Sequence, residues 1–396
     1  MGEHCETSGL IDRGRLLARY WRVASLFWFG RRAHTAWALT VFLVLIVLLQ
    51  LLVQYLLNLW NRNFFDALGR RDAAELWAQA FVFVPLAGAS IVLAASSVWG
   101  RMTAQRKWRE SMTRHVIEYW IAKDHFRRLS YNGNGSENPE YRISEDVRVA
   151  TDPPIDLALA FFSSVLTAIT FLSVLWSVGG SLVFEAFGRM WTIHGHLVIG
   201  VILYSSFFSG MMIMLGHHLI EVVETKNQAE AEFRSAIDLL RQHDERSDPE
   251  VSERADLRTL WLAVRATLRR WRDLCWQLVR TTLVSHGNFL LAPVVGWVLC
   301  IPQYAAGTMS LGELTQAAAA FVTVQGAFNW LVDNYGRLAD WRSSVNRVAK
   351  LLLAIDALDT AEASTESCEP ATPEEAPARS PVGAGSPASA ASTAIR

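Results

Sequence analysis

Long apolar stretches, separated by charged segments, set the pattern of this 396-residue chain. A helix needs roughly 20 mostly apolar residues to cross the hydrocarbon core of a bilayer. Six stretches approach or exceed that length: Ala36 to Trp60, Leu76 to Val98, Ile155 to Val178, His196 to Leu215, Leu283 to Ile301 and Leu311 to Val332. The pattern therefore predicts an all-α membrane protein with six transmembrane helices.

The sixth stretch is the least apolar of the set. It contains the small residues Ala317 to Ala320 and the polar residues Thr323 and Gln325. A buried helix of a soluble domain is the alternative interpretation. Its length and its five companion stretches favour a span.

The lysines and arginines are distributed very unevenly between the connections. Three connections hold Arg62, Arg70, Arg71 and Arg189, which leaves 33 of the 37 basic residues for the chain ends and the other two connections. Because basic residues gather on the cytoplasmic side of a membrane, we expect both termini to be cytoplasmic and Asp66 to lie outside.

Both cytoplasmic connections are long and helical in pattern. They run from Gly100 to Pro154 and from Gly216 to Thr282, with apolar residues spaced at helical intervals. The membrane helices are therefore expected to continue into the cytoplasm.

A turn-forming stretch, Tyr131 to Pro139, interrupts the first connection. We predict that Asn138 and Pro139 begin a short charged helix, Glu140 to Arg148, that ends near Pro153. Pro is tolerated in a first helical turn, where its missing N–H costs little. Glu145 and Asp146 are expected inside the cytoplasmic bundle, near Arg142 or Arg148, with a solvated surface helix as the alternative.

Composition divides the chain into three parts. We expect a cytoplasmic segment at residues 1–35, a transmembrane domain at 36–355 and a disordered tail at 356–396. The tail is rich in Ala, Ser, Pro, Glu and Thr and has few large apolar residues.

Sequence motifs give little sign of catalysis, cofactors or metal binding. No Gly-Lys dipeptide occurs, so these residues contain no Walker A phosphate loop and are not expected to form an enzyme. The four cysteines have no zinc or disulfide spacing. The pairs His194/His196 and His217/His218 read more simply as interface or core histidines than as metal ligands. The basic helices fit membrane topology without a nucleic acid.

Carboxylates near the membrane boundary are more informative, because charge at membrane depth is costly and usually faces a cavity or a partner. Glu221 and Glu224 follow the fourth stretch, with Glu230 beyond them, and Asp333 follows the sixth. If the inner helices enclose a water-filled cavity, these four carboxylates are candidate proton carriers. If they do not, the carboxylates are ordinary solvated helix residues.

Four segments together resemble the SbmA/BacA-like transporters and the transmembrane half of ABC permease–ATPase fusions, whose eukaryotic relatives are peroxisomal fatty-acyl transporters. The segments are Leu59 to Leu68, Glu137 to Arg148, Glu224 to Arg234 and Gln325 to Arg342. The resemblance covers roughly Leu10 to Lys350. It implies a type IV ABC-exporter-like domain, with helices exchanged between two subunits around a central cavity.

The chain departs from the fused relatives in two places. After Leu353, where an ATPase would follow, only the tail is present, and Arg241 to Pro249 lacks the expected glycine-containing turn. The stand-alone SbmA/BacA-like proteins also lack an ATPase and use the proton gradient, so the resemblance to them implies proton coupling. These proteins carry an additional N-terminal span that none of the six stretches matches, which makes this chain intermediate between the two groups.

Three functions follow as hypotheses. The first is a homodimeric, proton-coupled importer of peptides or bulky hydrophilic solutes in a bacterial inner membrane. The second is the permease subunit of an ABC transporter whose ATPase is a separate chain that docks on the Glu140 to Arg148 helix. The third is a membrane scaffold without transport activity. The expected partners are a second copy, membrane lipid, the solute and, for the second hypothesis, the ATPase.

Overall fold

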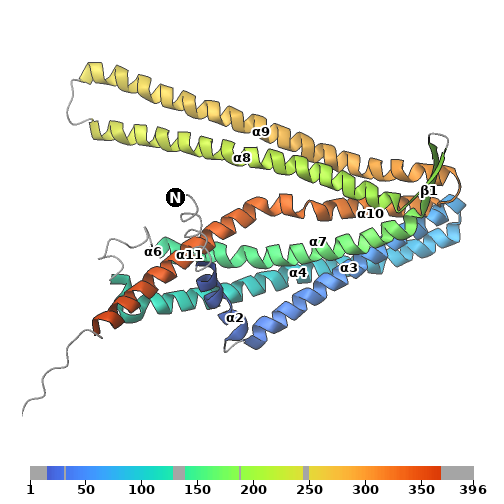
Figure 1. The fold of residues 1–396 in the computed structure, drawn as a ribbon, viewed down its shortest axis with the longest axis horizontal. Helices are drawn as coiled ribbons and strands as arrows, with labels where there is room; N and C mark the ends of the chain where they lie inside the picture. Colours follow the sequence, from blue (N-terminus) through green and yellow to red (C-terminus); the bar gives the residue numbers. More distant parts are fainter. Residues whose placement is uncertain (1–15, 31–32, 128–138, 187–188, 244–248, 367–396) are drawn as a thin grey trace, which may run out of the picture.

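The protein is a set of long helices lying roughly along one axis, with a small β-hairpin at one end (Figure 1). The computed structural model describes residues 16–30, 33–127, 139–186, 189–243 and 249–366. Asn138 of the predicted cytoplasmic helix lies outside the described residues.

The elements follow one another in a simple order. Residues 16–24 form a first helix. The labelled elements after it are α2 Leu26–Phe29, α3 Ala33–Arg70, α4 Ala73–Ile121, η1 Ala122–Asp124, α6 Pro139–Tyr141, η2 Arg142–Asp146, α7 Val147–Gly179, β1 Ser181–Ala186, β2 Arg189–His194, α8 His196–His243, α9 Pro249–Ala305, α10 Leu311–Phe328 and α11 Trp330–Glu366.

Five helices in the described part of the chain are long and apolar enough to cross a membrane. They lie within Ala33–Arg70, Ala73–Arg127, Arg142–Gly179, His196–Leu239 and Leu257–Ala305. They agree with the first five predicted stretches and make this a multi-pass helical membrane protein. The expected sixth stretch is helical, but its helix is interrupted at Asn329, between α10 and α11.

Helix α10 packs against α3, α7 and α9, in the interior of the bundle. Its small residues permit this position. Ala317, Ala318 and Ala320 are buried, and a side chain added at Gly296 of α9 would meet Ala318 at 3.1 Å. Small residues allow helix backbones to approach closely in membranes, where dispersion contacts replace the hydrophobic effect.

A β-hairpin that was not expected from the sequence follows α7. Strands β1 and β2 pair antiparallel, with Ser181 opposite His194 and Ala186 opposite Arg189. Each strand has six residues and includes a short apolar run, Leu182 to Phe184 in β1 and Met190 to Trp191 in β2, which is too short to predict a helix across the membrane.

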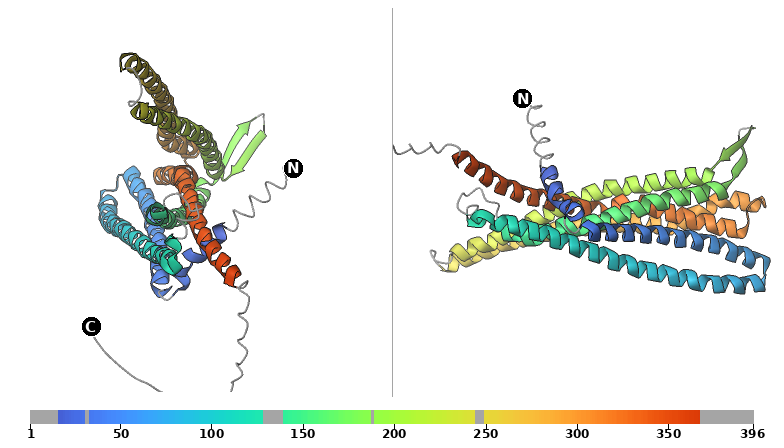
Figure 2. Two further views of the ribbon diagram at one scale, coloured as in Figure 1. Left: turned by 90° about the vertical axis from the view of Figure 1, so that its left-hand side faces the viewer. Right: turned by 90° about the horizontal axis from the view of Figure 1, so that it is seen from below.

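Helices α8 and α9 form a long hairpin that diverges from the other helices. The two pack along each other, and near the β-hairpin end they also contact α10. Towards the opposite end they stand apart from α7 and α11 (Figures 1 and 2). The prediction that the membrane helices continue well beyond their apolar stretches is confirmed for α4, α8 and α9.

Two apolar clusters hold the bundle together. One joins α7, α8, α9 and α10 around Phe171, Leu175 and Phe321. The other lies at the far end, where Tyr20 of the first helix packs with residues of α4, α7 and α11 such as Trp108. The predicted boundary of the tail at 356 needs correction, because α11 continues to Glu366.

Pro153 and Pro154 lie inside α7, so the expected end of the helix near Pro153 is wrong. A proline inside a helix leaves a carbonyl one turn earlier without its N–H partner. For Pro154 this is the carbonyl of Ala150, which accepts the Tyr20 hydroxyl at 2.7 Å and the Trp341 indole N–H at 3.2 Å. These side-chain donors replace the lost backbone hydrogen bond, and the helix continues.

Candidate functional site

The segment from Pro139 to Arg148 is a tight, irregular entry into α7. Pro139 begins the single turn α6, and Arg142 begins η2, a π-helical turn that ends at Asp146. A π turn spaces its hydrogen bonds at i→i+5, is rare, and occurs frequently at functional sites. It also changes which side chains face the bundle. Here Ile143 and Asp146 are buried, and Ser144 is exposed.

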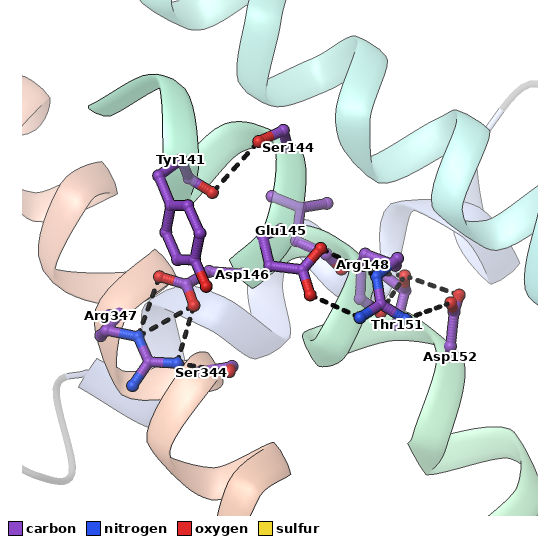
Figure 3. Close-up of polar contacts among 10 residues, drawn as sticks. Tyr141, Ser144, Glu145, Asp146, Arg148, Thr151, Asp152, Ser344 and Arg347 are labelled. Carbon is purple, nitrogen blue, oxygen red and sulfur yellow. Dashed lines mark hydrogen bonds and ion pairs between the residues drawn. The ribbon is translucent and has the colours of Figure 1, made fainter. Parts of the chain in front are cut away.

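Asp146 binds Arg347 of α11 across the bundle. The carboxylate is 1% exposed, and Arg347 donates to it from Nε at 2.9 Å and from Nη2 at 2.7 Å. Nη2 also donates to the Ser344 hydroxyl at 2.7 Å. This pair fixes the turn to α11 (Figure 3). The expectation that Asp146 would lie near Arg142 or Arg148 is therefore wrong, because the π turn directs it to α11.

Glu145 is paired with Arg148, one of the two arginines that the sequence placed near it, but it lies at the surface and not inside the bundle as expected. The Arg148 Nε donates to Glu145 Oε2 at 3.0 Å, and both side chains remain about two-fifths exposed, at 38% and 42%. The hydrogen bond from Arg148 lowers the pKa of Glu145. Glu145 is thus a surface residue of the turn, and Asp146 is its buried anchor.

A second polar cluster joins the ends of α4 and α11. Asp356 accepts two hydrogen bonds from Arg19, at 2.7 and 2.8 Å, and one from the Tyr119 hydroxyl. Asp359 binds Lys123 at 2.9 Å and the buried His125 at 3.2 Å. The sequence gives no signal for this cluster, because the paired residues are more than 200 positions apart and no motif marks them.

The four candidate proton carriers do not gather at one place. Glu221 is 71% exposed and lies 3.5 Å from His218, and Glu224 is exposed. Glu230 binds Lys226 at 2.9 Å and accepts from the Trp271 indole at 3.1 Å.

The contacts of Glu230 cross-link the two helices of the α8–α9 hairpin, well beyond the apolar stretch of α8. The hydrogen bond from Lys226 lowers the pKa of Glu230, so this carboxylate remains ionised near neutral pH. Among the four candidates, Glu230 is therefore the least suited to proton exchange.

Asp333 has a different environment. It lies in the first turn of α11, one residue beyond the predicted sixth stretch, and desolvation raises its pKa. Its side chain has no hydrogen bond or ion pair with the described residues. One and two turns before Asp333, Asn329 and Gln325 each bury a side-chain polar atom that has no hydrogen-bond partner among the described residues. Such polar atoms are available to water in the bundle.

At the opposite end of the molecule, α3 is clamped to the start of α10. Three residues spaced one turn apart make the contacts. The Asn58 side-chain amide donates to the main-chain carbonyl of Gln316 at 3.2 Å. Arg62 forms an ion pair with Glu313 at 2.7 Å. Asp66 accepts a hydrogen bond from the Gly312 N–H at 2.8 Å. Glu313 also completes a capping box with Ser310. We refer to this set as the α3–α10 clamp.

The described residues contain no group of three or more His, Cys, Asp and Glu side chains placed to hold a metal ion. His196 instead lies 3.2 Å from the Leu299 carbonyl, as a buried packing residue at the start of α8. The other histidine of that pair, His194, lies at the end of β2.

Comparison with known proteins places this architecture among transporters. A family model described as ABC transporter transmembrane region 2 matches residues 26–303. The inner membrane ABC transporter ATP-binding protein YddA of Escherichia coli is 26% identical over 84% of this chain and 60% of its own length.

More distant relatives point the same way. An uncharacterized ABC transporter ATP-binding protein of Haemophilus influenzae is 21% identical over 80% of this chain and 53% of its own length. The ABC transporter D family member 2, chloroplastic, of Arabidopsis thaliana is 19% identical over 85% of this chain and 45% of its own length. The chain thus spans about half the length of the curated relatives it matches.

Proposed function

This chain belongs to the ABC transporter transmembrane region 2 family, and on that premise we propose that it forms, as a homodimer, a proton-coupled importer of peptides or bulky hydrophilic solutes in a bacterial inner membrane. Membership of the family confirms the resemblance found in the sequence. Substrate class, energy source, subunit number and membrane are parts of the proposal.

Six spans per subunit in a type IV exporter arrangement are part of the same proposal. Helix α10 is the sixth span. Its polar residues Glu313, Gln316 and Gln325 lower its apolar character, but α3, α7 and α9 surround it. A helix with protein neighbours tolerates polar residues that a lipid-facing helix does not.

The α8–α9 hairpin supports a homodimer. Beyond the apolar stretches it exposes Ile237, Leu239, Trp261, Leu262 and Leu268, each between 45% and 65%. Large apolar side chains that are exposed together outside the membrane mark an interaction surface. In the proposed dimer a second copy covers them.

The environment of Asp333 is the observation that supports proton coupling. A proton carrier must change charge near working pH, and desolvation moves a carboxylate towards that range. The pKa of Asp333 is raised, and the buried amide atoms of Asn329 and Gln325 lie one and two turns before it. We therefore place Asp333 before Glu221 and Glu224 as the inner proton carrier, with Glu230 last.

Uptake into vesicles tests this proposal. The full chain in proteoliposomes is expected to accumulate a labelled peptide when a pH gradient alone is imposed. Asp333→Asn keeps the size of the side chain and removes its titration, so uptake should fall about tenfold or more, whereas Glu230→Gln should have little effect. Gradient-driven uptake that is unchanged in Asp333→Asn with Glu221→Gln and Glu224→Gln would refute these carriers.

The permease of an ABC transporter is the second candidate function, and the Pro139 to Arg148 turn favours it. Glu140, Tyr141 and Ser144 of this turn are exposed. The turn is fixed to α11 through Asp146 and Arg347, so a movement of the turn would be transmitted to α11. Uptake that requires an added ATPase chain and ignores the pH gradient would establish this alternative and overturn proton coupling.

A further inference from the structure

A hollow of about 630 Å³ lies between α2, the start of α3 and α4 (Figure 1). Helix α2 forms an apolar wall that includes Leu26. The polar lining comes from α3 and α4 and consists of His34, Thr35, Lys107, Glu110, Ser111 and Arg114. A hollow with an apolar wall and a few polar groups around it has the usual composition of a ligand site.

The hollow lies at the level where α3 enters the membrane. The first apolar stretch begins directly after Thr35. Helices α3 and α4 run antiparallel, and a side chain added at Gly100 of α4 would meet Phe42 of α3 at 2.9 Å. Lys107 and Thr35 are each seven residues from this contact, towards the same end, so they are level with each other. Phospholipid headgroups occupy roughly 5–8 Å on each side of the hydrocarbon core and therefore reach this level.

Lys107 and Arg114 place two cations beside one carboxylate. Glu110 accepts from the Lys107 ammonium at 3.4 Å and from the Arg114 guanidinium at 3.0 Å. These three side chains are 40–55% exposed, and their two positive charges and one negative charge leave a net charge of +1. An ammonium has three N–H donors and a guanidinium has five, so each cation keeps donors for an anion in the hollow.

Two hydroxyls lie in the same lining. Thr35 and Ser111 are partly buried, and neither hydroxyl forms a hydrogen bond with the described residues. Each hydroxyl can donate one hydrogen bond. A phosphate group offers several acceptor oxygens, and its bonds to lysine and arginine are stronger than those between neutral groups. The polar lining therefore suits a phosphate more than a neutral solute.

Large apolar side chains of α2 are exposed beside the hollow. Leu26 is 42% exposed and Phe29 is 78% exposed. The helix is fixed here by Trp28, whose indole N–H donates to the Thr40 hydroxyl at 3.2 Å and whose ring packs on Trp108 at 5.1 Å. Exposed aromatic residues next to cations are typical of the membrane interface, where the rings meet acyl chains and the cations meet phosphates.

We propose that this hollow binds the headgroup of an anionic phospholipid, of which phosphatidylglycerol is the simplest probe. Lys107 and Arg114 bind the phosphodiester, and Thr35 and Ser111 donate hydrogen bonds to its oxygens. The acyl chains lie against the exposed apolar side chains of α2. A net charge of +1 matches a headgroup of charge −1, and the bound lipid ties α2 to α4 at the membrane boundary. Such a site is independent of the transported solute and of the energy source.

Native mass spectrometry of the full chain, released from nanodiscs with equal amounts of phosphatidylglycerol and phosphatidylcholine, tests the site. Both lipids carry a phosphodiester, but only phosphatidylglycerol has a net negative charge. The wild type should retain phosphatidylglycerol about tenfold more often than phosphatidylcholine. Lys107→Gln with Arg114→Gln should lose this preference. Thr35→Val with Ser111→Ala should reduce retention several-fold without a change of charge.

Arg269→Gln with Arg272→Gln is the matched control. These two arginines are exposed on α9 and precede its apolar stretch by more than ten residues, so their replacement removes the same charge away from the headgroups. The control should keep the wild-type preference. Both charge variants should fold, because exposed ion pairs contribute little to stability.

Equal retention of the two lipids by the wild type, or an unchanged preference in Lys107→Gln with Arg114→Gln, would overturn the proposal. A preference that is lost equally in the α9 control would show a general attraction between charges and would also overturn it. Unchanged retention in Thr35→Val with Ser111→Ala would reduce the hollow to a basic surface without a built site. Excess inorganic phosphate should not displace the lipid, and complete displacement would assign the hollow to a soluble phosphate instead.

Discussion

Asp146 and Glu145 are neighbours in the chain with opposite environments. Asp146 is 1% exposed and bound to Arg347, and Glu145 is 38% exposed and bound to Arg148. Removing one partner of a fully buried ion pair costs about 3–5 kcal/mol, and an exposed pair contributes about 0–1 kcal/mol. The Asp146–Arg347 pair lies between these limits, because its carboxylate is buried and Arg347 is 43% exposed. We therefore expect Asp146 to stabilise the folded protein more than Glu145 does.

We expect Asp146→Ala to lower the thermal unfolding midpoint of the detergent-solubilised protein by several degrees and Glu145→Ala to leave it nearly unchanged. Arg347→Ala should lower the midpoint by a similar amount. Because the two residues interact, the double variant should lose less stability than the two single losses added together. Equal midpoints for Asp146→Ala and Glu145→Ala would contradict the buried anchor.

Asp359 gives a pH-dependent prediction. Lys123, followed by Tyr119 and His125, lowers its pKa in the folded state. A carboxylate with a lowered pKa contributes stability that is fully present above its unfolded value, near 3.9, and is lost as pH falls through the folded value. Asp359→Asn should therefore lower the unfolding midpoint by about 2–4 °C at pH 7. The difference from the wild type should shrink as pH falls below about 4, and a constant difference would speak against the ion pairs.

Pairs close in sequence were predictable, and pairs distant in sequence were not. Glu145 and Arg148 are three residues apart on a helical turn, so their contact follows from spacing. The partner of Asp146 is 201 positions away, and its direction depends on a π turn that no local signal announces. The same holds for Arg62 and Glu313, 251 positions apart, and for Asp356 with Arg19.

Among the elements, α10 shows how close packing depends on single positions. A side chain added at Gly312 would meet the Arg62 carbonyl at 2.1 Å and Asp66 at 2.6 Å, whereas one added at Gly326 would meet nothing within 4 Å. Gly312 is buried where α10 crosses α3, and Gly326 is exposed on the same helix.

Gly312→Ala should therefore lower the unfolding midpoint by about 5 °C or more, because a backbone contact cannot move aside easily. Gly326→Ala should be neutral or slightly stabilising, by up to about 1 kcal/mol, since alanine is the better helix former. Thermal unfolding of the two variants in one detergent measures both effects. Similar loss in both would show that α10 does not pack on α3 as described.

The elements that hydrophobicity dictates were predicted, and those that depend on packing were not. The five long spans follow from runs of apolar residues that have no other stable location. The passage of α7 through Pro153 and Pro154 depends on Tyr20 and Trp341 supplying donors from distant helices. The β-hairpin, at Ser181–Ala186 and Arg189–His194, is a local pairing in a segment read only as a connection.

At the scale of the molecule, both ends of the described chain lie at the same end of the bundle. The first helix and α11 share one apolar cluster through Tyr20 and Leu352, opposite the α3–α4 connection. Arginine and lysine asymmetry predicts that this end is cytoplasmic. Reporter fusions after Gly69 should be active outside the membrane, and fusions after Leu353 should be active inside. An outward-facing fusion after Leu353 would contradict the six-span proposal.

The α8–α9 hairpin is the proposed contact between two subunits. Its exposed apolar surface outside the membrane includes Trp261 at 61% and Leu262 at 65%, adjacent on α9. A single chain would leave this surface in water. A second copy can bury it, and the desolvated aromatic and aliphatic side chains then contribute most to association.

Trp261→Glu with Leu262→Glu should therefore convert the dimer to monomer, or weaken it at least about tenfold, as measured by mass photometry in nanodiscs. The conservative pair Trp261→Phe with Leu262→Ile keeps the surface apolar and should remain dimeric. Both variants should insert and fold, because neither position contacts the core of its own subunit. A wild-type protein that is monomeric in the membrane, or a charged variant that stays fully dimeric, would show that the hairpin is not the subunit interface. If the charged variant becomes monomeric and also loses uptake, the α8–α9 hairpin is the element that makes one subunit depend on the other.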